Sequence, residues 1–223
     1  MNKYFDFRAK NYAEKENICN QILMRVETQN SNNNLWDLLD KTLYDLCQKY
    51  PYHNNRQEIM TKICLIGRAY SAQIERRKNA EYTKGDFYSD YVVPTLMNSE
   101  IDDRIAQLKQ YKYPNAENIE EILSVHKYLQ DLFESITDMS KRSLASKYLH
   151  FHCPNLFYIY DSVSETEINR IIKRKENIPY TDADYRYAMY FGKSLYIQEI
   201  IAPDEMNFPR ILDSFLQDKF YKG

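Results

Sequence analysis

Glycine is nearly absent from this chain. Only four glycines occur among 223 residues, and proline occurs seven times, both below average usage in soluble proteins. Antiparallel sandwiches and barrels rely on glycine and Asn-Gly turns at their hairpins, so the scarcity argues against a many-stranded β fold. It also removes the glycine-rich loops that cradle phosphates, because neither GxxxxGK[ST] nor GxGxxG is present. The composition therefore favours a helical protein.

Apolar side chains recur every three or four residues along most of the chain, which is the pattern of amphipathic helices. The four clearest stripes begin at Leu35, Ile59, Ile101 and Ile119. Helical runs end at proline-containing breaks, because the residue before proline avoids helical dihedral angles. We therefore expect an all-α fold with roughly eight to ten helices packed as a single domain.

The domain is expected to span residues 1–223. A hinge near 112–118 would divide it into two lobes, 1–112 and 118–223. The one strand-like segment, 157–160, is apolar and aromatic and is too short to build a sheet.

The net charge and the cysteine spacing limit which binding partners and which cellular compartment we expect for this protein. The net charge is −2 and the isoelectric point about 6.1, which is no electrostatic footprint for non-specific nucleic-acid binding, although a local basic face is compatible with it. The four cysteines have no CxxC spacing, so a zinc site is unsupported and reduced thiols are expected. No signal region or membrane-length apolar run is present, and we expect a cytoplasmic protein without a membrane partner.

The segment 143–162 carries the densest group of reactive side chains. Ser143, Lys147 and His150 are spaced by four and three, which places them on neighbouring turns of one helix. After Pro154 a short apolar segment leads to Asp161, just before the next predicted helix. An aspartate there either caps that helix or acts as a base or electrostatic partner, and the residues alone leave both roles open.

A resemblance to known DNA glycosylases is carried by Ala145-Ser-Lys-Tyr-Leu-His-Phe, Pro154 and Phe157-Tyr-Ile-Tyr-Asp161-Ser. These residues resemble the helix and aspartate segment of the helix-hairpin-helix superfamily, especially its 8-oxoguanine-glycosylase-like members. Asp161 matches the catalytic aspartate at the start of a helix, and Ala145 matches a small helix residue. The resemblance covers about 25 residues and implies an enzyme that hydrolyses the N-glycosidic bond of a flipped base.

Two departures from that family affect the predicted reaction. The glycine-containing hairpin that grips the DNA backbone is replaced by Thr137-Asp-Met-Ser-Lys-Arg142, which has no glycine. Ser143 stands where bifunctional members carry their Schiff-base lysine, with Lys141 and Lys147 nearby. The resemblance therefore implies hydrolysis by water assisted by Asp161, as in a monofunctional glycosylase. Lys147 and His150, which are grouped with Asp161 in the sequence, complete the catalytic candidates.

Basic and aromatic residues supply the candidates for nucleic-acid binding. Cations are expected to contact phosphates, and tyrosines to stack on bases. The basic candidates are Arg68, Arg76, Lys141, Arg142 and Lys173. The tyrosine candidates are Tyr70, Tyr148, Tyr158 and Tyr160. AT-rich codon usage also explains the 21 tyrosines, so their number by itself indicates no function.

Other functions remain open at this point. The main alternative is a non-catalytic helical module that binds nucleic acid or protein and uses Asp161 only as a helix cap. A hydrolase or nuclease that uses His150 and Asp161 is a weaker alternative. His150 and His152 diverge by about 200° on a helix, so we expect no metal and no cofactor. Convergence of Asp161, Lys147 and Arg68 in a tyrosine-lined cleft would favour the DNA-acting enzyme.

Overall fold

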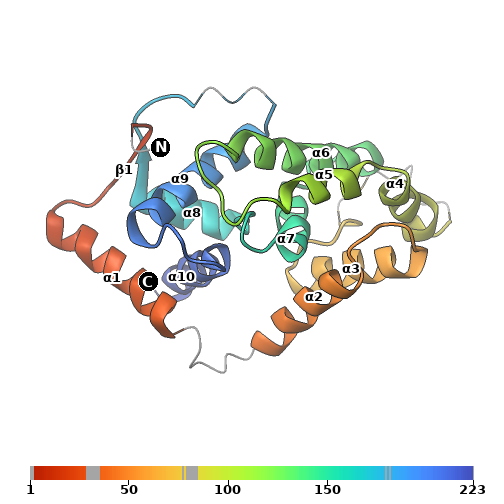
Figure 1. Ribbon diagram of the computed structural model, residues 1–223, viewed down its shortest axis with the longest axis horizontal. Helices are drawn as coiled ribbons and strands as arrows, with labels where there is room; N and C mark the ends of the chain where they lie inside the picture. Colours follow the sequence, from red (N-terminus) through yellow and green to blue (C-terminus); the bar gives the residue numbers. More distant parts are fainter. Residues whose placement is uncertain are drawn as a thin grey trace.

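The computed structural model describes residues 3–28, 36–76, 78, 85–178, 180 and 182–222. Over these residues it contains ten α-helices, one short π-helix and one two-stranded sheet (Figure 1), which confirms the predicted all-α class. In chain order the helices are α1 (Tyr12–Thr28), α2 (Asp37–Lys49), α3 (Arg56–Ala69), the π-helix η2 (Tyr88–Val92), α4 (Val93–Met97), α5 (Ile101–Leu108), α6 (Ile119–Thr137), α7 (Arg142–His152), α8 (Ser162–Ile171), α9 (Tyr185–Ile201) and α10 (Phe208–Lys222). Leu35, where the first predicted stripe begins, lies outside the described residues.

The small sheet pairs β1 (Phe5–Phe7) with β2 (Ile172–Arg174) in antiparallel register. The expectation that 157–160 is the one strand-like segment was wrong, because those residues have no strand partner. Their backbone is satisfied by side chains instead: the Tyr187 and Tyr190 hydroxyls donate to the carbonyls of Tyr158 and Ile159 at 3.0 and 2.7 Å. Periodicity alone does not reveal such tyrosine donors.

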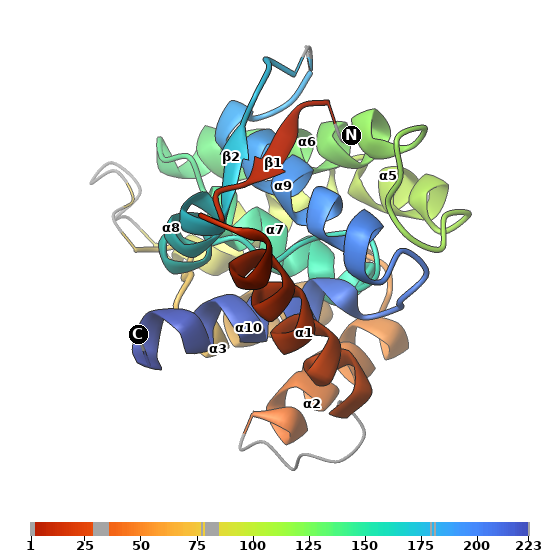
Figure 2. The ribbon, with the colours of Figure 1, turned by 90° about the vertical axis from the view of Figure 1, so that its left-hand side faces the viewer.

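The N-terminal segment packs against the C-terminal helices. β1 pairs with β2, and α1 contacts α9 and α10; Figure 2 shows α1 beside α10. A lobe boundary near 112–118 would therefore separate the two strands of the sheet.

The turn between α6 and α7 forms without glycine. Asp138 ends α6 in the left-handed conformation, with φ 54° and ψ 23°, and its N–H donates to the Glu134 carbonyl. Aspartate tolerates this conformation better than most residues. The Thr137 hydroxyl donates to the Phe133 carbonyl at 2.7 Å and accepts from the Met139 N–H at 3.2 Å. A tight helix-turn-helix connection is therefore present where the sequence lacks the expected glycines.

Helix α7 lies at the centre of the structure, in contact with α2, α3 and α6. Because helices surround it, every residue from 144 to 151 is buried, including Lys147 and His150. Its neighbouring residues Lys147 and Tyr148 are bonded to different partners, so α7 contributes to two separate polar clusters. None of the helices in the described part of the chain is long and apolar enough to cross a membrane.

Candidate active site

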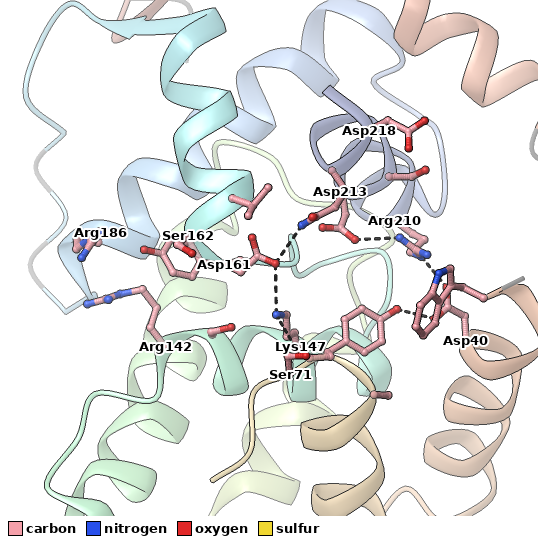
Figure 3. A pocket seen from close by; sticks show the side chains of 18 of the residues that line it. Asp40, Ser71, Arg142, Lys147, Asp161, Ser162, Arg186, Arg210, Asp213 and Asp218 are labelled. Atoms are coloured by element: carbon pink, nitrogen blue, oxygen red, sulfur yellow. Dashed lines mark hydrogen bonds and ion pairs between the residues drawn. The ribbon is translucent and has the colours of Figure 1, made fainter. Parts of the chain in front are cut away.

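A cavity of about 820 Å³ opens where residues from α2, α7, α8 and α10 meet the end of α3 (Figure 3). Its volume lies within the range of roughly 300–1,000 Å³ typical of small-molecule sites. Four acidic residues line it: Asp40, Asp161, Asp213 and Asp218. Four basic residues line it as well: Arg142, Lys147, Arg186 and Arg210. The aromatic lining consists of Trp36, Tyr70 and Tyr160.

Asp161 is both the N-cap of α8 and part of the cavity wall. Its Oδ1 atom accepts the Ser164 N–H at 2.8 Å. Its Oδ2 atom accepts the side-chain amide of Gln217 at 3.1 Å and lies 3.5 Å from the Lys147 Nζ atom. The side chain is 26% exposed. One oxygen therefore serves as the helix cap, while a cation and an amide hold the other oxygen beside the cavity.

Lys147 reaches this carboxylate from the interior. Its side chain is 4% exposed, and Nζ also donates to the Tyr70 carbonyl at 3.1 Å. Burial of an ammonium group is costly unless a charge partner is present, and Asp161 is that partner. Lys147 therefore fixes Asp161 in position and provides positive charge beneath it.

A second charged cluster forms the opposite end of the cavity (Figure 3). Arg210 donates from Nε to Asp40 at 2.8 Å and from Nη1 to Asp213 at 2.9 Å. The Tyr70 hydroxyl donates to Asp40 at 2.5 Å. Complete burial raises the pKa of Asp213 to about 6, against the lowering effect of Arg210. Burial likewise raises the pKa of Tyr70, so its hydroxyl remains a donor at neutral pH.

Helix α10 connects the two clusters. Gln217 donates from Nε2 to Asp161 at 3.1 Å and to the Ser164 hydroxyl at 3.2 Å. Ser164 in turn donates to Asp213 at 3.3 Å. Gln217, Arg210 and Asp213 were not among the residues predicted from the sequence. The available signal was their spacing of three and four, which places three polar residues on one face of an otherwise amphipathic helix.

The cavity brings together five of the residues predicted from the sequence: Asp161, Lys147, Tyr70, Arg142 and Tyr160. The Tyr160 hydroxyl donates to Glu165 at 2.8 Å, and Arg142 forms an ion pair with Asp184. The two tyrosine rings are therefore held by hydroxyl contacts rather than free to rotate. They present rigid aromatic walls.

The structure places His150 in the core and not at the cavity. It is fully buried; Nδ1 donates to the Phe157 carbonyl at 2.9 Å and Nε2 accepts from the Tyr44 hydroxyl at 2.6 Å. Burial lowers the pKa of His150 to about 3. A neutral ring with both nitrogens occupied has a structural role, and no Ser–His–Asp arrangement forms with Asp161.

Tyr148 and Tyr158 are likewise fully buried. The Tyr148 hydroxyl lies 2.7 Å from Nε2 of His53, and the Tyr158 hydroxyl donates to Gln198. Neither ring presents a face on which a base could stack, so the structure assigns both tyrosines to the core.

The remaining basic candidates lie outside the main cavity. Arg68 is 66% exposed and lies 3.7 Å from Glu75, so it does not converge with Asp161. Arg76 and Lys141 line a smaller neighbouring cavity of about 260 Å³, where Lys141 Nζ donates to the Arg76 carbonyl at 2.6 Å. Lys173 is exposed on β2.

Comparisons with protein-family models, curated proteins and solved structures gave no match to this chain. Among the described residues, no group of three or more His, Cys, Asp or Glu side chains is arranged to hold a metal ion. The chemistry of the site is therefore argued from the cavity and its side chains.

Proposed function

We propose that this protein acts on DNA as a glycosylase-like hydrolase that cleaves the N-glycosidic bond of a flipped nucleotide. The observation that carries the proposal is the Asp161 carboxylate, held by Lys147 and Gln217 at the wall of an open, ligand-sized cavity. A carboxylate that served only as a helix cap would need neither the buried lysine nor the cavity.

The proposed reaction uses Asp161 in two ways. As the C1′–N bond breaks, its electrons leave with the base and positive charge develops on the sugar. A carboxylate close to that charge stabilises the oxocarbenium-like transition state electrostatically. Water then attacks C1′, and Asp161 accepts the proton that the water loses. Lys147 holds the Asp161 carboxylate in place through the ion pair and forms no covalent intermediate.

The aromatic lining gives the cavity a means of holding a base. Trp36, Tyr70 and Tyr160 line it, and stacking on aromatic rings is how flipped bases are commonly bound. Asp40 fixes the Tyr70 hydroxyl and Glu165 fixes that of Tyr160. Rings fixed before binding lose little conformational freedom when a base stacks on them.

The arrangement of the helices also supports the proposal. The tight turn at Asp138 connects α6 to α7, α7 supplies Lys147, and Asp161 caps α8. This order is the one that the resemblance to helix-hairpin-helix glycosylases implies, with Asp138 in the left-handed conformation where a glycine was expected.

Base release tests the proposal. Purified protein is incubated with single- and double-stranded DNA containing damaged or modified bases, and released bases are identified by mass spectrometry. Wild type is expected to release a base, and Asp161→Asn to reduce that rate at least 100-fold while asparagine still caps α8. Asp103→Asn, an exposed aspartate of α5 outside the cavity lining, is the charge-matched control. Equal release by wild type and Asp161→Asn would contradict the proposal.

A non-catalytic binding module is the second candidate, and the 2.8 Å cap between Asp161 and the Ser164 N–H favours it. This candidate predicts that wild type binds DNA or a protein without releasing any base. Under it, Asp161→Asn binds as wild type does, because asparagine preserves the cap.

A further inference from the structure

Two arginines line the same end of the cavity. Arg142 is the first residue of α7, and Arg186 lies in the first turn of α9. Figure 3 shows their guanidinium groups directed toward one another, at the end opposite Arg210 and Asp40.

Each guanidinium is held by one carboxylate through the same edge. Arg142 donates from Nε and Nη2 to Asp184, and Arg186 donates from Nε and Nη2 to Glu165. Neither arginine donates from Nη1 to any of the described residues. A guanidinium has five N–H donors, so the Nη1 edge of each remains available to a ligand.

Asp184 and Glu165 orient the two arginines, and the guanidinium groups still face each other across this end of the cavity. Asp184 and Glu165 offset the two positive charges, so an anion between the arginines would be held by their unused N–H donors. Guanidinium groups bind phosphate and carboxylate through paired N–H donors, which makes arginine pairs suited to such anions. The geometry is that of an anion subsite.

The position of the pair relates this subsite to Asp161. The Cζ atom of Arg142 lies 5.7 Å from the centre of the Tyr160 ring. The Tyr160 hydroxyl donates to Glu165, the same carboxylate that holds Arg186. Asp161 lines the same cavity as both arginines, so an anion bound by the pair would share that cavity with the candidate catalytic carboxylate.

We propose that Arg142 and Arg186 form a phosphate subsite, which binds a phosphate of the nucleotide whose sugar faces Asp161. The anion is a phosphate monoester of a free nucleotide or a phosphodiester of a strand, and both present the same oxygens. The assignment to a nucleotide rests on the proposed function. The anion subsite itself rests only on the two arginines.

The net charge of −2 sharpens this inference. A chain with this charge has no overall excess of cations to contact phosphates, so a few well-oriented arginines would account for much of the binding. Loss of one of them should then have a large effect on affinity and on the salt dependence of binding.

The test measures binding separately from catalysis, in protein that already carries Asp161→Asn. Fluorescence anisotropy follows a labelled single-stranded oligonucleotide over a range of salt concentrations, and calorimetry follows adenosine monophosphate and inorganic phosphate. Arg186→Gln is the main variant, since its side chain is 58% exposed and its loss should leave the fold intact. Arg142→Lys is the second variant and keeps the charge but loses the planar fork.

Arg170→Gln is the matched control. Arg170 is 65% exposed and paired with Glu167, but it does not line the cavity. The Arg170→Gln substitution therefore removes an exposed, paired arginine like Arg186, but from outside the cavity.

The subsite predicts about tenfold weaker binding for Arg186→Gln than for Arg170→Gln, the effect of one charge-assisted contact. For a single strand the slope of log K against log salt should also fall by about 0.7. Weaker oligonucleotide binding identifies a phosphodiester, and weaker binding of the monophosphate alone identifies a free nucleotide. Equal affinities of the two variants for every probe would overturn the subsite, whatever the base-release assay gives.

Discussion

Two polar clusters meet at α7, and they resemble each other in composition. On the cavity side Lys147 lies 3.5 Å from Asp161. On the core side His53 donates from Nδ1 to Asp102 at 2.5 Å and accepts at Nε2 from the Tyr148 hydroxyl, 2.7 Å away. Each cluster pairs a buried basic group with an aspartate, and each involves a residue of α7.

The two clusters differ in access. The His53 side chain is 1% exposed and Tyr148 is fully buried. The Asp102 carboxylate is 30% exposed, but none of these three residues lines either of the two cavities. Burial lowers the pKa of His53, so the ring remains neutral and bonded within the core. An Asp–His–Tyr arrangement is therefore no evidence of catalysis by itself. Access to a ligand-sized cavity distinguishes the Asp161 cluster, and we assign function to it for that reason.

Acidification should destabilise the fold through the buried core histidines, and this is the largest effect that we predict. Burial lowers the pKa of His126 and His150 from 6.5 to about 3. The unfolded chain then binds protons that the folded protein does not, so their stabilisation is complete above pH 6.5 and is lost as the pH falls toward 3. At pH 5 each histidine should lower the free energy of unfolding by about 2 kcal/mol relative to pH 7.5. Urea unfolding at several pH values measures this loss.

The stability that Asp213 contributes should change with pH in the opposite direction. Its pKa is raised from 3.8 to about 6, so the folded protein favours the protonated acid. The stabilisation is present below pH 3.8 and is lost as the pH rises through 6. Asp213→Asn should be more stable than wild type at pH 7, on the order of 1 kcal/mol, and should lose this advantage at pH 4. An advantage that is the same at both pH values would contradict this assignment.

Removing the central ring of the core cluster should destabilise the fold without affecting the reaction. His53→Leu leaves the Asp102 carboxylate and the Tyr148 hydroxyl without their partner. The Asp102 carboxylate is 30% exposed and can be hydrated, whereas an unpaired buried hydroxyl costs about 1–3 kcal/mol. We therefore expect the free energy of unfolding, measured with urea, to fall by about 1–3 kcal/mol. The rate of base release per folded molecule should remain that of wild type. A selective loss of activity in a stable His53→Leu protein would show that the core cluster takes part in the reaction.

Removing a hydrogen-bond partner of Asp161 should slow the reaction and leave the stability of the fold nearly unchanged. Gln217→Leu deletes the amide that donates to Asp161 and to Ser164. A less well-oriented carboxylate should slow base release about tenfold, whereas the free energy of unfolding should change by no more than about 1 kcal/mol. Gln217→Glu places a second carboxylate beside Asp161, which should raise the apparent pKa of the acidic limb in the pH–rate profile. An unchanged profile would mean that Gln217 does not act through Asp161.

The smallest effect is expected at Arg68, which the sequence suggested as a phosphate ligand. It is 66% exposed and its distance to Glu75 is 3.7 Å, and exposed pairs of this kind contribute about 0–1 kcal/mol. Arg68→Ala should leave stability, binding and base release near the values of wild type. A strong loss of DNA binding in this variant would extend the binding surface beyond the cavity.

The helical class could be predicted from the sequence because apolar periodicity and proline positions reflect local structure. Asp161 and Lys147 could also be predicted as site candidates. A position within one helix and a position just before the next helix are local features as well. Arg210, Asp213 and Gln217 were not predicted, because α10 reaches the cavity through tertiary packing against α1, α8 and α9. For the same reason His150 was a candidate in the sequence: its two partners, Tyr44 and the Phe157 carbonyl, become visible only in the folded structure.

The most direct test of the comparison is base release under single-turnover conditions by two matched variants, Asp161→Ser and Asp102→Ser. Serine caps α8 nearly as well as aspartate, so the first variant removes the carboxylate of the cavity. The second removes the Asp102 carboxylate, which binds His53 outside the cavity. If the cavity carries the chemistry, Asp161→Ser slows release at least 100-fold and Asp102→Ser retains the wild-type rate per folded molecule. An equal loss in both variants, or a wild-type rate for Asp161→Ser, would contradict the assignment of function to the cavity.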